Sequence, residues 1–160
     1  MKFIGLLFIV MANFTFADMS ANCKNESGTI TCSANESGES FVDMKCKQNG
    51  SQTICNGSYQ DLAPVGLNMS CDHLKNGDVK CSGNAGDEYK FSMSCVKQAN
   101  NVKNMDCNIS DNLGSSLSLS CGSNDKGIPN CFGTDNDGTG VSVNCLDDGK
   151  GNSSCSANIK

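Results

Sequence analysis

The twelve cysteines of this 160-residue chain recur at regular intervals, and their spacing constrains the fold more than any other feature. Short gaps between consecutive cysteines alternate with long gaps, and every second cysteine follows at a step of 23 to 26 residues. A period in this range is typical of repeat architectures and predicts six copies of one unit, each with two cysteines. The cysteines are Cys23, Cys32, Cys46, Cys55, Cys71, Cys81, Cys95, Cys107, Cys121, Cys131, Cys145 and Cys155.

Alternating apolar and polar residues precede the first cysteine of each copy, as in Val42-Asp-Met-Lys-Cys46 and Phe91-Ser-Met-Ser-Cys95. This alternation places the apolar side chains and the cysteine on one face of a β-strand. Turn dipeptides such as Ser27-Gly28 and Asn49-Gly50 separate the two cysteines of a copy, as hairpins require. The pattern predicts an all-β fold: a disulfide-stapled repeat of six two-stranded antiparallel units, with about twelve short strands.

Two architectures fit this period: a meander of hairpins and, as the alternative, a parallel β-solenoid of about 24 residues per coil. Opposed residues of an antiparallel pair lie about 4.5–5.5 Å apart, within disulfide reach, whereas facing sheets lie about 10 Å apart. Hairpin pairing is therefore favoured, and linkage across the long gaps, such as Cys32–Cys46, is the competing scheme. The predicted disulfides are Cys23–Cys32, Cys46–Cys55, Cys71–Cys81, Cys95–Cys107, Cys121–Cys131 and Cys145–Cys155.

The first seventeen residues have the pattern of a signal peptide. Lys2 precedes an apolar run over residues 3–11, which has the length of a signal-peptide core and is too short to span a bilayer. Small residues at Thr15 and Ala17 predict cleavage before Asp18. We therefore expect a signal peptide at 1–17 and a cysteine-rich β-repeat domain at 18–160. The expected location is secreted, or periplasmic in a bacterium, without a membrane span.

Composition and motifs argue against several functional classes. The net charge of −5 and the absence of arginine disfavour nucleic acid as a partner. The single histidine, His73, is expected to be exposed on a hairpin arm, and no C-x-x-C pair offers a zinc or redox site. The segments 135–138, Asp-Asn-Asp-Gly, and 147–149, Asp-Asp-Gly, resemble parts of calcium loops, and the first lacks the flanking acids of such a loop. Both are expected to form β-turns, with weak calcium binding as the alternative. No catalytic, cofactor-binding or metal-binding residue is predicted, and the chain is not expected to be an enzyme.

One segment resembles a known family. Phe91-Ser-Met-Ser-Cys95, followed by Cys107, the glycine turn at Gly114, the strand from Ser115 to Leu119 and a turn over 124–127, is similar to a repeat of the cyanovirin-N homology lectins. This resemblance covers mainly residues 91–127 and implies a secreted all-β sugar-binding protein. It transfers no binding residue to this chain.

These observations lead to one expected function and one alternative. The first is a secreted, non-catalytic, lectin-like binding module, with carbohydrate as the leading ligand class, because Asn, Ser, Asp and Gly offer hydrogen bonds to sugar hydroxyls. The alternative is a secreted structural or effector protein that contacts a host or matrix protein. The expected partners are thus glycans or an extracellular protein.

Overall fold

A computed structural model describes residues 19–36, 39–60, 64–99, 101–123, 129–150 and 152–159. Every regular element in these ranges is a β-strand. The strands are β1 (Met19–Glu26), β2 (Thr29–Glu36), β3 (Glu39–Asn49), β4 (Gln52–Gln60), β5 (Pro64–His73), β6 (Val79–Ala85), β7 (Tyr89–Gln98), β8 (Asn101–Asp111), β9 (Ser116–Ser123), β10 (Pro129–Asp135), β11 (Gly140–Asp147) and β12 (Asn152–Ile159).

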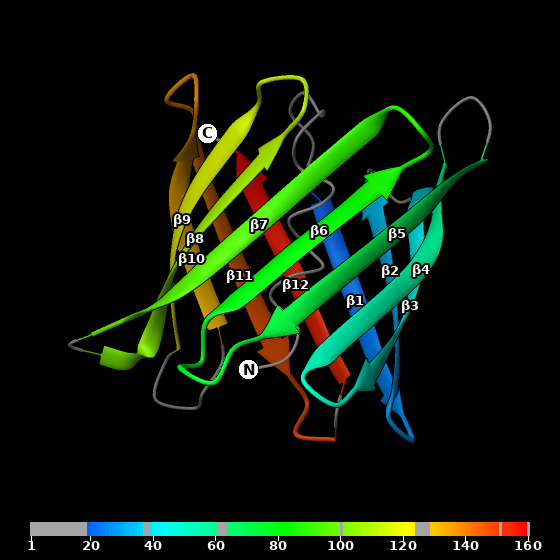
Figure 1. The fold of residues 1–160 in the computed structure, drawn as a ribbon, viewed down its shortest axis with the longest axis horizontal. Coiled ribbons are helices and arrows are strands. Elements are labelled where there is room, and N and C mark those ends of the chain that lie inside the picture. Colours follow the sequence, from blue (N-terminus) through cyan, green and yellow to red (C-terminus); the bar gives the residue numbers. More distant parts are fainter. Residues whose placement is uncertain are drawn as a thin grey trace.

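The strands form one closed antiparallel barrel in which each strand pairs with its neighbours in the sequence (Figure 1). The last strand, β12, pairs with β1 and closes the circle. The solenoid alternative is therefore wrong, because the strands of this barrel pair antiparallel throughout. The strands are also longer than expected, at 7 to 11 residues, since a barrel wall needs a continuous ladder of hydrogen bonds around its whole circumference.

All twelve cysteines form disulfides within hairpins, and the six predicted pairs are confirmed. In the first hairpin Cys23 lies directly opposite Cys32, with a Cα–Cα distance of 4.1 Å, and Ser27-Gly28 forms the predicted turn. Ser27 and Gly28 both have positive φ, which suits a tight hairpin turn. Linkage across the long gaps does not occur.

The barrel interior is apolar and rich in sulfur. Among the described residues no polar or charged side chain is buried, whereas all twelve cysteines are buried. Five methionines join them in the core: Met19, Met44, Met69, Met93 and Met105. The inward position of the cysteines follows from the alternation of the strands and was predicted.

Neighbouring hairpins are joined with a constant offset. The second cysteine of each hairpin lies opposite the residue two places before the first cysteine of the next hairpin. These pairs are Cys32 with Met44, Cys55 with Met69, Cys81 with Met93, Cys107 with Leu119, Cys131 with Val143 and, across the closing junction, Cys155 with Ala21. A regular stagger of this kind tilts the strands and lets a sheet close on itself.

Small inward-facing residues let adjacent strands approach each other. Gly57 follows Cys55 by two places, and a Cβ there would collide with the backbone oxygen of Asp43. Gly133 stands in the same relation to Cys131, and its Cβ would collide with the backbone oxygen of Ser118. These positions therefore require glycine for space, although their backbone φ is ordinary.

The expected signal peptide at 1–17 lies outside the described residues. Within the described part of the chain, no helix has the length and apolar character needed to cross a membrane.

Candidate functional site

The outer face of the barrel carries mainly Ser, Asn, Thr, Lys and Asp side chains, because each inward residue alternates with an outward polar one. A shallow groove of about 620 Å³ lies on this face where the two ends of the chain meet, across β11, β12, β1 and β2. We call it the seam groove. It exists only because β12 pairs with β1.

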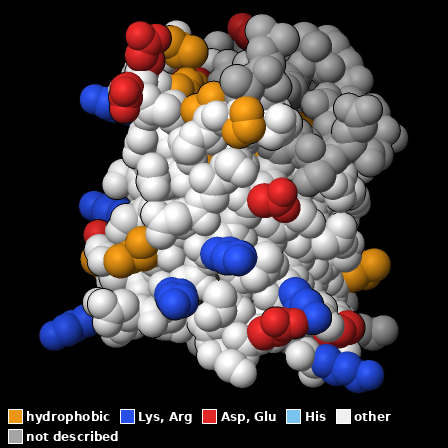
Figure 2. All heavy atoms as spheres, turned by 90° about the vertical axis from the view of Figure 1, so that its right-hand side faces the viewer, with side chains coloured by type: hydrophobic (Ala, Val, Ile, Leu, Met, Phe, Trp, Pro, Cys, Tyr) orange, Lys and Arg blue, Asp and Glu red, His pale blue; other side chains and the backbone are white. Residues whose placement is uncertain are grey.

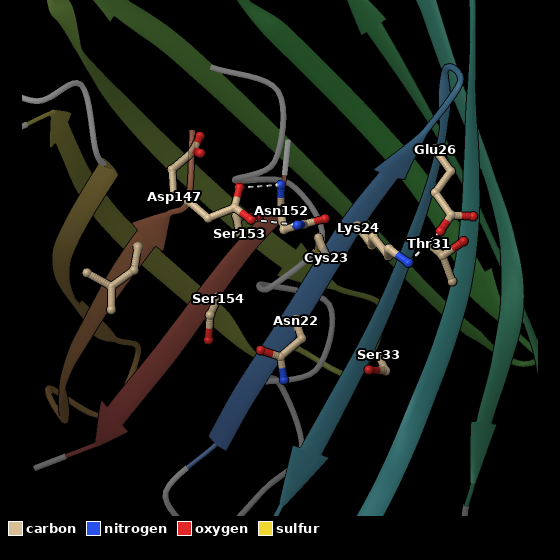
Figure 3. A pocket seen from close by; sticks show the side chains of 12 residues that line it. Asn22, Cys23, Lys24, Glu26, Thr31, Ser33, Asp147, Asn152, Ser153 and Ser154 are labelled. Carbon is tan, nitrogen blue, oxygen red and sulfur yellow. Dashed lines mark hydrogen bonds and ion pairs between the residues drawn. The ribbon is translucent and has the colours of Figure 1, made fainter. Parts of the chain in front are cut away.

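A row of four side chains runs across the seam groove at right angles to the strands. Asn22 on β1 lies directly opposite Ser33 on β2 and Ser154 on β12, and Ser154 lies opposite Leu146 on β11. Figure 3 shows the side chains of Asn22, Ser33 and Ser154 projecting from neighbouring strands into the groove. Leu146 is 69% exposed, which is unusual for a leucine within a strand. The row therefore combines one amide and two hydroxyls with an exposed aliphatic surface.

Charged and amide groups stand at one end of the groove (Figure 3). Lys24 Nζ forms an ion pair with Glu26 Oε1, and both side chains are about two-thirds exposed, at 65% and 68%. Hydrogen bonding to Glu26 raises the pKa of Lys24, and the same contact lowers the pKa of Glu26. Both groups are thus charged at neutral pH.

Asp148 organises the turn at the same end. Its Oδ1 accepts hydrogen bonds from the backbone N–H of Lys150 at 2.7 Å and of Asn152 at 3.0 Å, and its Oδ2 accepts one from Asn152 Nδ2 at 2.6 Å. These bonds, led by that from Lys150, lower the pKa of Asp148. The Asn152 amide is held in place by this turn, with its Oδ1 still available to a ligand.

The row places hydrogen-bonding groups beside an apolar surface. Asn22, Ser33 and Ser154 supply donors and acceptors at successive strands, about 4.8 Å apart. Leu146 supplies an apolar surface beside them.

Of the residues singled out in the sequence, His73 and the segment 135–138 do not lie at this groove, whereas Cys23 and Asp147 are part of its lining. His73, at the end of β5, is half-buried rather than exposed as expected, because its Nε2 lies 2.9 Å from Thr53 Oγ1 on β4. Asp135 forms the predicted turn: its Oδ1 accepts hydrogen bonds from the backbone N–H of Asp137 and Thr139. No cluster of His, Cys, Asp or Glu with the makings of a metal site occurs among the described residues.

Sequence reasoning did not identify the seam groove, because its strands come from the two ends of the domain. The pattern around each cysteine placed Asn22 and Ser154 on the outer face, but only the closing register brings them together. The exposed Leu146, which follows Cys145 where polar residues are common, was the available signal.

Comparison of the chain with protein-family models, curated proteins and solved structures gives no significant match. The resemblance to cyanovirin-N homology lectins therefore stays a prediction. The segment that carries it lies on β7, β8 and β9, and the turn over 124–127 lies outside the described residues.

Proposed function

We propose that the protein is a secreted, non-catalytic carbohydrate-binding module and that the seam groove binds the sugar. The observation that carries this proposal is the row of Ser33, Asn22, Ser154 and the exposed Leu146 across four neighbouring strands. Sugar sites combine a few placed polar groups with an apolar contact. The lectin-like segment at 91–127 supports the same ligand class.

Secretion is supported by the disulfides. Six disulfides in a small domain are typical of extracellular proteins, because reducing systems keep cytosolic thiols reduced. The signal-like segment at 1–17 agrees with export to an oxidising compartment.

In this proposal the six hairpins are copies of one unit. Their constant offset of two residues, which also holds at the closing junction, supports this origin. The inward positions are then shared by all copies, and the outward positions have diverged to form a ligand site at the seam.

A glycan array probed with the oxidised protein tests the function. We expect binding to a subset of mannose-, galactose- or GlcNAc-type glycans, and Asn22→Ala is expected to weaken it about tenfold through the loss of one or two hydrogen bonds. Asn144→Ala is the matched control, since Asn144 is an exposed outward asparagine on β11 that does not line the groove. Absence of binding to every glycan, or equal losses in the two variants, would overturn the proposal.

A further inference from the structure

A second groove, of about 450 Å³, lies on the outer face of β4, β5, β6 and β7. In the cyclic strand order β3 separates these strands from β11, β12, β1 and β2 on one side, and β8, β9 and β10 separate them on the other. In Figure 1, β5, β6 and β7 cross the front of the barrel, whereas β11, β12 and β1 lie behind them. The second groove is therefore separate from the seam groove.

Three asparagines in register cross the second groove, with a lysine at each end of their row. The pairing of β3 to β7 places Lys45 opposite Asn56, Asn56 opposite Asn68, Asn68 opposite Asn84, and Asn84 opposite Lys90. We call these five residues the asparagine row. At an interstrand spacing of about 4.8 Å, the two lysines stand about 19 Å apart along the barrel surface.

The polar groups of this row are available to a ligand. Asn56 and Asn68 are exposed, and neither side chain has a hydrogen bond within the described part of the chain. Asn84 Nδ2 donates to the backbone oxygen of Gly86 at 2.6 Å, which fixes the amide and leaves Oδ1 open. Neither Lys45 nor Lys90 has a salt bridge with another described residue.

A parallel row of serines lies beside the asparagines. Ser70 on β5 pairs with Ser82 on β6, and Ser82 pairs with Ser92 on β7. Ser70 and Ser82 line the groove, and the one acidic residue among its described lining is Asp87. Amides, hydroxyls and the Lys90 ammonium thus face the groove, and Lys45, which is not part of the groove lining, extends the row onto β3.

We infer that the asparagine row binds an acidic polysaccharide, one whose sugars carry carboxylate or sulfate groups at intervals. The amides would hydrogen-bond ring hydroxyls, and Lys45 and Lys90 would each bind an acidic group about 19 Å apart on the same chain. This spacing exceeds the Debye length of about 8 Å at physiological salt, so each lysine acts on its own acidic group. This site and ligand class go beyond the neutral sugar proposed for the seam groove.

A sparsely charged polysaccharide fits this surface better than a nucleic acid. Figure 2, which shows the side of the barrel at the right of Figure 1, has lysine side chains mainly in its lower half, and several of them lie beside carboxylates. Asp43 lies two residues before Lys45, and Asp72 lies opposite Lys80, so acidic groups interrupt the positive potential. These carboxylates would repel a densely charged DNA strand. In addition, no aromatic side chain among the described residues lines the groove, so none is placed to stack on a base.

Binding to immobilised hyaluronan, which carries a carboxylate on every second sugar, tests this inference. Asn56 and Asn68 stand in Asn-x-Ser sequons, so the protein is produced in the bacterial periplasm, where these asparagines stay unmodified. We expect salt-sensitive binding. The double variant Lys45→Gln/Lys90→Gln is expected to weaken it about fivefold to tenfold, because each exposed ion pair contributes a small factor.

The matched control is Lys75→Gln/Lys150→Gln, which removes the same charge from exposed turn residues outside the second groove. It is expected to change binding by less than about twofold. Equal weakening by the two double variants would overturn the inference, as would absence of binding to hyaluronan or tighter binding to single-stranded DNA. Asn22→Ala in the seam groove should leave this binding unchanged, so failure here is distinguishable from failure of the proposed function.

Discussion

The inner and outer faces of the barrel wall follow different rules, although they are built from alternate residues of the same strands. Inside, a cysteine pair recurs at the same position of each hairpin, apolar residues recur two places before its first cysteine, and no described polar side chain is buried. Outside, each hairpin carries its own combination of Ser, Asn, Lys and Asp. The inner face therefore specifies the fold, and the outer face is free to differ from one hairpin to the next.

This difference explains how a domain with few large apolar side chains forms a stable barrel. Each disulfide joins cysteines that are 9 to 12 residues apart in the sequence and contributes about 2–4 kcal/mol, mainly by restricting the unfolded chain. The side chains of the outer face therefore contribute little to the stability of the fold, and substitutions there should change binding more than folding.

Reduction of the disulfides should have the largest effect on stability. Six crosslinks together can exceed the net stability of a typical domain, about 5–15 kcal/mol. We expect the reduced and alkylated protein to lose its β-sheet circular dichroism and its cooperative thermal transition. Retention of both signals would show that the apolar core holds the fold without the disulfides. The inner face would then not owe its stabilising role to the cysteine pairs.

The second-largest loss of stability is expected from substitution of a glycine on the inner face. Gly133→Ala should lower the free energy of unfolding by about 1–3 kcal/mol, because the added methyl collides with backbone atoms of β9 at Ser118 and Leu119. Gly66→Ala is the control, since Gly66 is an exposed strand residue and no atom lies within 4 Å of the place that its added methyl would take. Urea denaturation of the two variants measures the difference, and equal values would contradict the close inner packing.

Two adjacent residues of β12 provide a finer test. Ala157 is 1% exposed and faces inward, so Ala157→Ser buries a hydroxyl and should cost about 1–3 kcal/mol. Ser156 is exposed, and Ser156→Ala should change stability by less than about 0.5 kcal/mol. If chemical denaturation gave the two variants the same stability, the inward and outward assignment of β12 would be wrong.

The smallest expected effect concerns a turn on the outer face. Burial opposes ionisation of Asp111, but hydrogen bonds from the backbone N–H of Ser115 and Leu113 outweigh it and lower its pKa below the ordinary 3.8. Because the folded state holds the carboxylate ionised, this stabilisation is present above pH 3.8 and is lost as the pH falls through the folded-state pKa.

Asp111→Asn keeps the acceptor oxygen but removes the charge. We expect a loss of about 1 kcal/mol at neutral pH that shrinks towards zero in strong acid, as followed by thermal denaturation across pH. A loss of the same size at both extremes of pH would show that the charge of Asp111 does not contribute.

Local periodicity could be predicted from the sequence, whereas closure of the barrel could not. The alternation before Cys46 or Cys95 predicts an inward cysteine, and the loop length between Cys23 and Cys32 predicts the hairpin disulfide. Closure depends on the summed offset of all six hairpins, which no single motif contains. For the same reason neither the seam groove nor the asparagine row was found, because their residues become neighbours only through the register, as with Asn22 and Ser154.

Non-reducing peptide mapping of the double variant Asn22→Cys/Ser154→Cys tests the closed barrel most directly. Residues 22 and 154 lie opposite each other on the outer face of β1 and β12, within the reach that a disulfide needs. We predict a seventh crosslink between them, together with the six native hairpin disulfides. A folded variant with free thiols at 22 and 154 would contradict the closed barrel and the seam groove. Native cysteines linked across the long gaps would contradict the hairpins that carry both proposed sites.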